Sequence, residues 1–551
     1  MSSFRPTRRE FLAATTLAAA GELFRGSRAA AQPIHHISAK TTQSVDAYLD
    51  TRVPDDTLRA LALHAVDVAR QSGASYADVR IAERQTLYPG FTSVGTRAAV
   101  TYGVRALVDG VWGFSYGRSP ALDAVTQCAR DAVSLARLSS QLSGAGTAGP
   151  LPGAAGTVVD PAWSPPPVVT GTWQTPIEID PFTIPVQQHA ELAIAVEMMV
   201  KRVPGASGSF RIDWFRETRV FAATTGSLLT QRLYRVVPDI TAAVRFGSNV
   251  IRLQIPELHA RSAGYELVAR ADLMTAMKAA AERAAALTRV PFGTIDVGRY
   301  PLVLCGDAMA TLMIVVLGQA CELDRALGTD VDIGTSYLPL DQLGGAVASP
   351  LLTVRGNRSG DGIATVQWDD DGVAPVEHTV VRDGVLNDYH SSVETAPALT
   401  DWYRRHKQTP RSNGCAVAND AGDIVMVRPP NLTVVPSQGH TPIETLYKDM
   451  RKGILVLTEI GVSSDQQLTS GGIWGQPFEV QRGQLVRRLR RVQMQFNTTP
   501  LLKGLTAIGD ATTVRPADVW TRKGMPWVDG RTSASAPAAL FKEINVVTFP
   551  V

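Results

Sequence analysis

The 551-residue chain has few cysteines, and their spacing excludes one class of protein. The four are Cys128, Cys305, Cys321 and Cys415, and no two of them form a Cys-x-x-Cys pair. So few cysteines in so long a chain exclude a small domain held together by disulfides. We expect buried free thiols, with a single disulfide as the alternative.

The sequence also lacks an excess of one charge and a long apolar run. Its formal net charge is +3, from 54 basic and 51 acidic residues. Residues 1–31 contain five Arg and two Glu, so the rest of the chain carries 49 charges of each sign. Composition therefore gives no electrostatic case for a nucleic-acid partner. No later stretch is apolar for the roughly twenty residues of a membrane helix, so we expect no membrane span.

The N-terminus has the features of a twin-arginine export signal. Arg8 and Arg9 lie in TRREFL, ahead of a weakly apolar run that ends near Ala20, and residues 29–31 are three alanines suited to cleavage. About ten apolar residues are too few to cross a bilayer as a helix. We therefore expect residues 1–31 to be a signal peptide recognised through Arg8 and Arg9, and the rest of the protein to be periplasmic.

Hydrophobic periodicity predicts an α/β part followed by a β-rich part. Helices are expected at residues 55–72, 119–139, 184–202 and 265–288, and strands at 76–82, 98–108, 111–115, 209–215, 218–223 and 228–236. Residues 141–178 are rich in Gly, Ala, Pro and Thr and predict a linker or an extended surface strap. After residue 300 most segments are strand-like, including 347–354, 363–368, 376–381 and 422–427. The exceptions are residues 310–325 and a helix near 441–453.

These patterns predict the α+β class. The expected organisation is a signal peptide at 1–31, an N-terminal α/β domain at 32–140, the linker at 141–178, a central α/β region at 179–292 and a large, mostly antiparallel β domain at 293–551.

Short motifs keep their order and spacing from about residue 55 to 548. The N-terminal ones are GASYADVR (73–80), GVR (103–105), DGVWGF (109–114), DP (180–181) and ATTG (223–226). The C-terminal ones are VASPLLTV (347–354), DDGV (370–373), DGVL (383–386), SNG (412–414), NLTV (431–434), KGI (452–454) and SAPA (535–538). Together they resemble the TldD/PmbA family, also called modulators of DNA gyrase, whose better understood members are zinc peptidases. The resemblance implies the family's α+β fold, with a metallopeptidase-like C-terminal domain, and a dimer that encloses a cavity.

Active members of that family carry a His-Glu-x-x-x-His motif and a later Cys. The two His and the Cys bind zinc, and the Glu takes the proton from the attacking water. Glu322 and Asp324, together with a Gly that precedes them, allow the motif to be aligned with residues 310–325. The first His then falls on Ile314, the Glu on Val315 and the second His on Gln319.

The aligned positions have lost the chemistry of the motif. Ile314 and Val315 are β-branched apolar residues, which suit packing and cannot bind a metal. The late ligand is missing too, because no Cys follows Cys415 and residues 518–523 contain none. We therefore expect a degenerate metal site at Ile314, Val315 and Gln319, with no catalytic residue, no bound metal and no other cofactor.

The remaining candidates are expected to be structural. Cys321 is interpreted as a buried thiol rather than a rebuilt metal ligand. Residues 368–372, WDDDG, lack the alternating ligands of an EF-hand and predict a turn. His378 and His390 lie in predicted strands or at their ends, do not form a helical pair and are not expected to be catalytic. The basic stretch 482–491 predicts a solvated strand edge, with guidance of an acidic peptide or partner as the alternative.

Two functions of different classes remain. In the first, the protein is the non-catalytic, TldE-like subunit of a two-subunit peptidase. Its partner is then a zinc-bearing TldD-like paralogue, and the substrate is an unfolded peptide paired as an added strand. In the second, it is a periplasmic homodimer that binds peptides or proteins, or scaffolds a complex, without cleaving anything. Hydrolysis by an unrecognised nucleophile is a weaker third possibility, since no Gly-x-Ser-x-Gly occurs.

Overall fold

The computed structural model describes residues 35–38, 53–89, 93–143, 159–247, 249–255, 258–329, 335–524 and 527–548. The expected signal peptide, with Arg8 and Arg9, lies outside these ranges. Residues from His35 onward form one compact unit. Within the described residues, no helix combines the length and the apolar character needed to cross a bilayer, as the sequence predicts.

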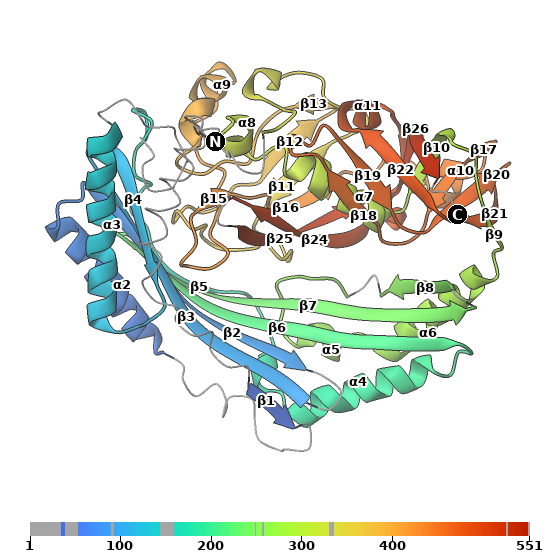
Figure 1. Ribbon diagram of the computed structural model, residues 1–551, viewed down its shortest axis with the longest axis horizontal. Coiled ribbons are helices and arrows are strands. Elements are labelled where there is room, and N and C mark those ends of the chain that lie inside the picture. The colour runs from blue at the N-terminus through green and yellow to red at the C-terminus, as the bar shows by residue number, and fades with distance from the viewer. Residues whose placement is uncertain are drawn as a thin grey trace, which may run out of the picture. The chain divides into compact units, whose positions relative to one another are not determined.

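Eight strands form a sheet with the order β1-β3-β2-β6-β7-β5, in which β4 pairs with β3 and β8 with β7 (Figure 1). All neighbours are antiparallel except β5 and β7. The β2–β6 pairing joins strands from the expected N-terminal and central regions in one sheet. Part of the Pro-rich segment joins this sheet as β5. The strands are β1 (His35–Ser38), β2 (Tyr76–Pro89), β3 (Ser93–Val108), β4 (Val111–Gly117), β5 (Thr170–Gln174), β6 (Ala206–Ala223), β7 (Leu228–Phe246) and β8 (Asn249–Gln254).

Two groups of helices cover this sheet because their apolar faces recur at helical spacing. Helices α2 (Asp55–Gln71) and α3 (Leu122–Ser143) pack on the β2–β4 end, where they bury one hydrophobic core. Helices α4 (Val186–Val200), α5 (Glu266–Ala269) and α6 (Leu273–Thr288) bury a second core against β6, β7 and β8. Gly113 of β4 allows α3 to approach closely, because a Cβ there would lie 2.0 Å from the carbonyl oxygen of Ala132.

The C-terminal half contains two larger sheets and one two-stranded sheet. The ten-stranded sheet has the order β18-β19-β22-β26-β10-β17-β20-β21-β9, with β23 on β26, and the six-stranded sheet has the order β13-β12-β11-β16-β25-β24. Most of their strand pairs are antiparallel, which confirms the predicted α+β class. The strands of the ten-stranded sheet are β9 (Phe292–Gly293), β10 (Gly298–Leu304), β17 (Lys452–Val456), β18 (Gly461–Ser464), β19 (Ser470–Trp474), β20 (Pro477–Gln481), β21 (Gln484–Leu489), β22 (Val492–Asn497), β23 (Leu505–Ile508) and β26 (Ala539–Thr548). The others are β11 (Val354–Asn357), β12 (His378–Arg382), β13 (Val385–Leu386), β14 (Ala416–Val417), β15 (Met426–Val427), β16 (Asn431–Val434), β24 (Arg515–Lys523) and β25 (Val528–Ala536).

Helix α7 (Gly306–Met313) lies in the largest hydrophobic core, which contains residues of both larger sheets. The short helices in this half are α8 (Leu323–Ala326), α9 (Thr400–Arg405), α10 (Ile443–Tyr447) and α11 (Thr498–Lys503). The strand predicted at 363–368 is wrong. Side chains of β7 bind this segment's backbone in place of a neighbouring strand: Arg235 donates to the Ile363 carbonyl (3.1 Å) and Gln231 to that of Trp368 (2.8 Å).

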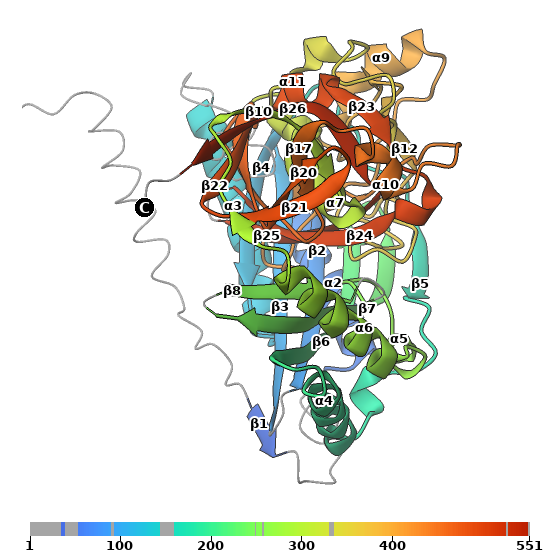
Figure 2. The same ribbon diagram turned by 90° about the vertical axis from the view of Figure 1, so that its right-hand side faces the viewer.

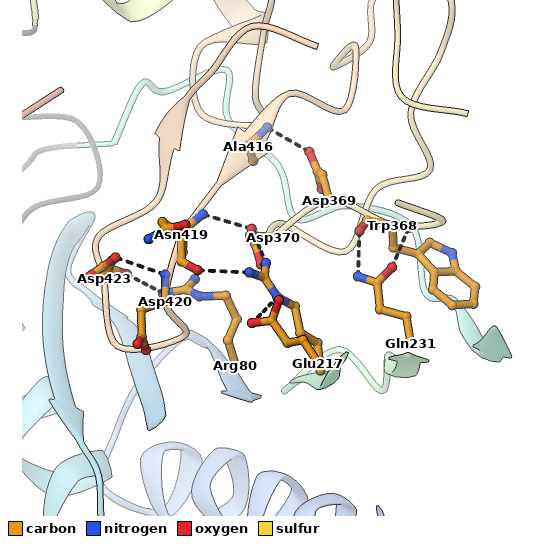
Figure 3. A network of polar contacts seen from close by, with 12 residues as sticks. Arg80, Glu217, Gln231, Trp368, Asp369, Asp370, Ala416, Asn419, Asp420 and Asp423 are labelled. Atoms are coloured by element: carbon orange, nitrogen blue, oxygen red, sulfur yellow. Dashed lines mark hydrogen bonds and ion pairs between the residues drawn. The ribbon is translucent and has the colours of Figure 1, made fainter. Parts of the chain in front are cut away.

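The WDDDG segment forms a turn, as predicted, and attaches the C-terminal half to the eight-stranded sheet (Figure 3). Its turn is closed by a hydrogen bond from the Gly372 N–H to the Asp369 carbonyl (3.0 Å). Asp370 accepts from Arg219 of β6 at 2.8 Å, and Asp371 accepts from Arg105 of β3 at 2.8 Å. The side chains of the three aspartates and of Arg105 and Arg219 are buried or nearly so. Because buried charges are costly unless paired, this contact fixes how the two halves meet.

Candidate functional site

Helix α7 continues into a single π turn, η3 (Ile314–Gly318), at the positions aligned with the zinc motif. The N–H of Gln319 donates to the carbonyl oxygen of Ile314, five residues earlier, at 3.2 Å. In an α-helix, positions i and i+5 are about 140° apart around the axis, so they face different directions. A π turn brings them to the same side, and such turns are frequent at functional sites. The backbone therefore has the geometry that a His-Glu-x-x-x-His spacing requires.

The three aligned side chains have different surroundings. Ile314 is fully buried in the core between the two large sheets. Val315 is 7 % exposed and lies in the wall of a cleft. Gln319 is half-buried. Neither aliphatic side chain has a donor atom for a metal, and a neutral amide is a poor zinc ligand compared with imidazole or thiolate. The residues at these positions do not fit a zinc ion.

The cleft beside Val315 has a volume of about 900 Å³ and is lined by both halves of the compact unit. In Figures 1 and 2, β24 and β25 lie on the side of the C-terminal half that faces β7 and β8. Asp518, Val519 and Trp520 of β24 line the cleft. These three residues belong to the segment 518–523, which lacks the late Cys of active family members. This segment and Val315 therefore line the same cavity.

Two strands that line the cleft are edge strands. Within the described ranges, β24 pairs only with β25, and β18 pairs only with β19. Residues 515–520 of β24 and 461–462 of β18 line the cavity. An edge strand has backbone N–H and C=O groups free on one side, and an extended peptide can pair with them as an added strand. The cleft therefore has the features of a peptide groove.

Carboxylates and arginines line the cleft in similar numbers. Desolvation within the cleft, together with the negative charges of Asp307, Asp518 and Asp239, raises the pKa of Glu459 to about 7. Arg531 offsets part of this charge by an ion pair with Asp518. A carboxyl group that titrates near neutrality can exchange protons at ordinary pH, so the charge of the cleft changes in that range.

A buried ionic cluster lies directly after the π turn. The Lys523 ammonium, 1 % exposed, donates to Glu322 at 2.9 Å, to Asp324 at 2.6 Å and to the carbonyl oxygen of Val427 at 3.0 Å. Burial raises the pKa of Glu322, but the charges of Lys523 and two arginines lower it more, so its net shift is downward. In the sequence the two carboxylates serve only to align the motif, and Lys523, about 200 residues later, is not predicted to join them. No local pattern could have revealed this partner.

All four cysteines are buried free thiols, as predicted. Cys321 is fully buried, and burial raises the pKa of its thiol. It is not part of the cluster of potential metal ligands found among the described residues, which consists of His378, His390 and Cys415. His378 and His390 do not form a helical pair in the sequence, and only the fold brings their rings together, with centroids 5.2 Å apart.

Two parts of the chain match models of known protein families. Residues 297–548 match the PmbA/TldA metallopeptidase C-terminal domain, and residues 91–136 match domain 1 of the same family. A metalloprotease of Methanothermobacter thermautotrophicus is 26% identical over 294 residues, which cover 52% of this chain and 59% of that relative. The match thus spans less than two thirds of the relative's length.

Two solved structures resemble the chain over most of its length. TldE from Thermococcus kodakarensis has a TM-score of 0.62 at 14% identity, with 88% of this chain and 100% of that chain covered. A protein named as a modulator of a DNA gyrase from Thermotoga maritima has a TM-score of 0.64 at 16% identity, with 89% and 100% covered. At such low identities these similarities show the fold alone.

Proposed function

The chain belongs to the TldD/PmbA family of metallopeptidase-like proteins, and from this premise we propose that it is the non-catalytic, TldE-like subunit of a two-subunit peptidase. The observation that carries the proposal is the π turn at Ile314–Gly318. Its backbone suits the spacing of the zinc motif, while Ile314, Val315 and Gln319 stand where the ligands and the general base would be. We interpret this stretch as a degenerate metal site.

The cleft supports a role in binding peptide. Main-chain pairing on β24 or β18 needs no metal, so it survives the loss of the zinc ligands. Trp520, which is 54% exposed and lines the cleft, offers an apolar surface for a substrate side chain. In this proposal the partner is a zinc-bearing TldD-like paralogue, which supplies the metal and the general base, and the present chain contributes substrate binding and shape.

The proposal is tested by co-purification and a cleavage assay. We expect the protein, co-expressed with a zinc-motif paralogue, to form a stable 1:1 complex that cleaves an unfolded peptide, whereas the chain alone cleaves none. In that complex, Trp520→Ala should raise the KM for the peptide. Trp527→Ala is the matched control, because this side chain is similarly exposed (59%) and does not line the cleft.

Each alternative result has a defined meaning. Homodimers that bind peptide without cleaving it, with no zinc-bearing subunit attached, would favour the second hypothesis, a homodimeric binding or scaffold protein. Cleavage by the chain alone would refute the non-catalytic assignment. Equal effects of the two tryptophan substitutions would remove the cleft from the proposal.

We further propose export to the periplasm through the twin-arginine route. The motivation is the sequence of residues 1–31. Replacing both Arg8 and Arg9 by Lys should leave the precursor in the cytoplasm, because that pathway requires the arginine pair rather than positive charge alone. Cell fractionation and N-terminal sequencing provide the measurement. A processed form that begins near Gln32 in the double variant would show that another route is used.

A further inference from the structure

Three potential metal ligands, His378, His390 and Cys415, meet in the interior of the C-terminal half. His378 begins β12, His390 lies beside the start of α8, and Cys415 immediately precedes β14. Their exposed fractions are 5%, 0% and 0%. One ligand atom from each lies within 4.8 Å of the other two. Neither the degenerate motif nor the cleft includes these residues.

The hydrogen bonds of the two imidazoles indicate which of their nitrogens carry protons. His378 Nδ1 lies 3.1 Å from the carbonyl oxygen of Val376, so it carries the proton and its Nε2 is an acceptor. This Nε2 lies 3.0 Å from Nδ1 of His390. A carbonyl that fixes the tautomer of a histidine in this way is the usual support of a metal ligand. The remaining nitrogen, Nε2 of His390, is buried and has no hydrogen-bond partner among the described residues.

The two histidines are neutral and can bind a metal ion directly, whereas the thiol must first lose its proton. Burial lowers the pKa of both imidazoles, so they are neutral and protons do not compete for their lone pairs. Burial raises the pKa of Cys415 to about 12, so the free thiol is protonated and unreactive. A metal ion must therefore displace this proton, as thiophilic ions do when they bind cysteine.

We propose that His378, His390 and Cys415 form a structural binding site for a thiophilic metal ion, either Zn²⁺ or Cu⁺. Two imidazoles and a thiolate are donors that both ions accept. Bond lengths of about 2.0 Å to nitrogen and 2.3 Å to sulfur place ligand atoms roughly 3.3–3.7 Å apart, so small side-chain movements suffice. This site departs from the expectation that the protein has no cofactor, and it does not depend on the proposed function.

Charge distinguishes the two ions. With one thiolate and two neutral imidazoles, Cu⁺ gives a neutral group, which a buried environment tolerates best. Zn²⁺ leaves one positive charge. The carboxylate of Asp388 acts electrostatically on Cys415 and offsets that charge, whereas Arg358 opposes it. The positive charge of Arg411 near His378 and that of Lys523 near His390 also disfavour a net positive charge at the site.

A metal ion at this site would connect β12, β14 and the segment at the start of α8, which follows the π turn in the chain. The N–H of His390 donates to the Cys321 carbonyl at 2.8 Å, and the Leu323 N–H donates to the His390 carbonyl at 3.0 Å. The N–H of Cys415 donates to the Ser391 carbonyl, also at 3.0 Å. A metal here would fix α8 to β12 and β14. Because the ligands are almost fully buried, the ion would enter during folding and leave only when the protein unfolds.

The test measures metal in the full-length chain, purified through a tag without histidine after expression with added zinc or with added copper. We expect one ion per chain that resists a chelator in the native state and is released in urea. The chain refolded with Co²⁺ should show thiolate-to-cobalt charge-transfer absorption. Cys415→Ser should lose the metal and this absorption. Cys128→Ser, which removes a buried thiol of the N-terminal half, should keep both.

The outcomes decide the proposal even if a variant misfolds. A wild-type chain that contains neither metal under either condition overturns it, and so does the absence of the thiolate absorption in the refolded wild type. Metal that remains in Cys415→Ser places the ion elsewhere and also overturns it. The two growth conditions distinguish zinc from copper.

Discussion

Replacing Lys523 by Met tests how the region next to the π turn is stabilised. The Lys523 ammonium is fully buried and is paired with Glu322 and Asp324. Methionine has a similar length and no charge, so the substitution removes the ion pairs without leaving a large cavity. Breaking a buried ion pair from one side costs about 3–5 kcal/mol.

Glu322 and Asp324 keep other partners in Lys523→Met, so the expected loss of unfolding free energy is near the lower end of that range. Glu322 keeps Arg325 at 3.2 Å and Arg428 at 3.9 Å. Asp324 keeps backbone hydrogen bonds from Arg325 at 2.8 Å and from Val427 at 3.1 Å. Neither carboxylate is left wholly without a partner, so we expect the free energy of unfolding to fall by about 3 kcal/mol at neutral pH.

The loss should depend on pH with a definite sign. The pKa of Glu322 is lowered from its ordinary value of 4.5: burial raises it, but the charges of Lys523, Arg325 and Arg428 lower it more. A lowered pKa stabilises the fold above about 4.5, and this stabilisation disappears as the pH falls through the folded-state value. In Lys523→Met the pKa of Glu322 is lowered less than in the wild type. The difference in unfolding free energy between the variant and the wild type should therefore narrow as the pH falls.

Urea unfolding followed by tryptophan fluorescence provides the measurement, at neutral pH and near pH 4. Lys503→Met is the matched control, because Lys503 is an exposed lysine in the last turn of α11, and we expect it to change stability by less than about 0.5 kcal/mol. A loss under about 1 kcal/mol in Lys523→Met would refute the assignment of a stabilising buried cluster. A loss of the same size at both pH values would refute the role of the carboxylates.

Three further predictions concern the zinc motif, a buried histidine and the contact between the halves. The triple variant Ile314→His, Val315→Glu, Gln319→His should cleave no peptide by itself, and its unfolding free energy should fall by at least about 2 kcal/mol because position 314 is in the core. Burial lowers the pKa of His189 to about 4, so stability should fall as the pH drops from about 6.5 to 4, by up to roughly 3 kcal/mol. His189→Phe should flatten this fall in acid unfolding curves, and an unchanged curve would contradict the assignment. Asp371→Ala removes a partner of Arg105 and should increase hydrogen exchange at the contact between β3 and the WDDDG turn; unchanged exchange there would mean that this ion pair does not hold the halves together.

Features that depend on neighbouring residues can be predicted from the sequence alone. Helices α2 and α4 appear where apolar residues recur at helical spacing, and the turn at 368–372 is found where Gly372 adopts a φ of +79°. The α+β class and the family also followed from the sequence, because the motifs keep their order over most of the chain. The absence of His and Glu at residues 314, 315 and 319 can likewise be read from the sequence.

Which distant groups meet is visible only in the folded chain. The apolar stretch at 310–325 predicts a helix, but not the π turn, which packs Gly318 against Leu432 of β16. A Cβ on Gly318 would lie 3.0 Å from that leucine side chain, so the local backbone is tied to a strand more than a hundred residues away. Lys523 of β24 contacts Glu322 and Asp324, about 200 residues earlier in the chain, and Cys415 lies close to the two histidines. Such contacts arise when distant segments share one buried volume, and periodicity within a short window cannot specify which segments those are.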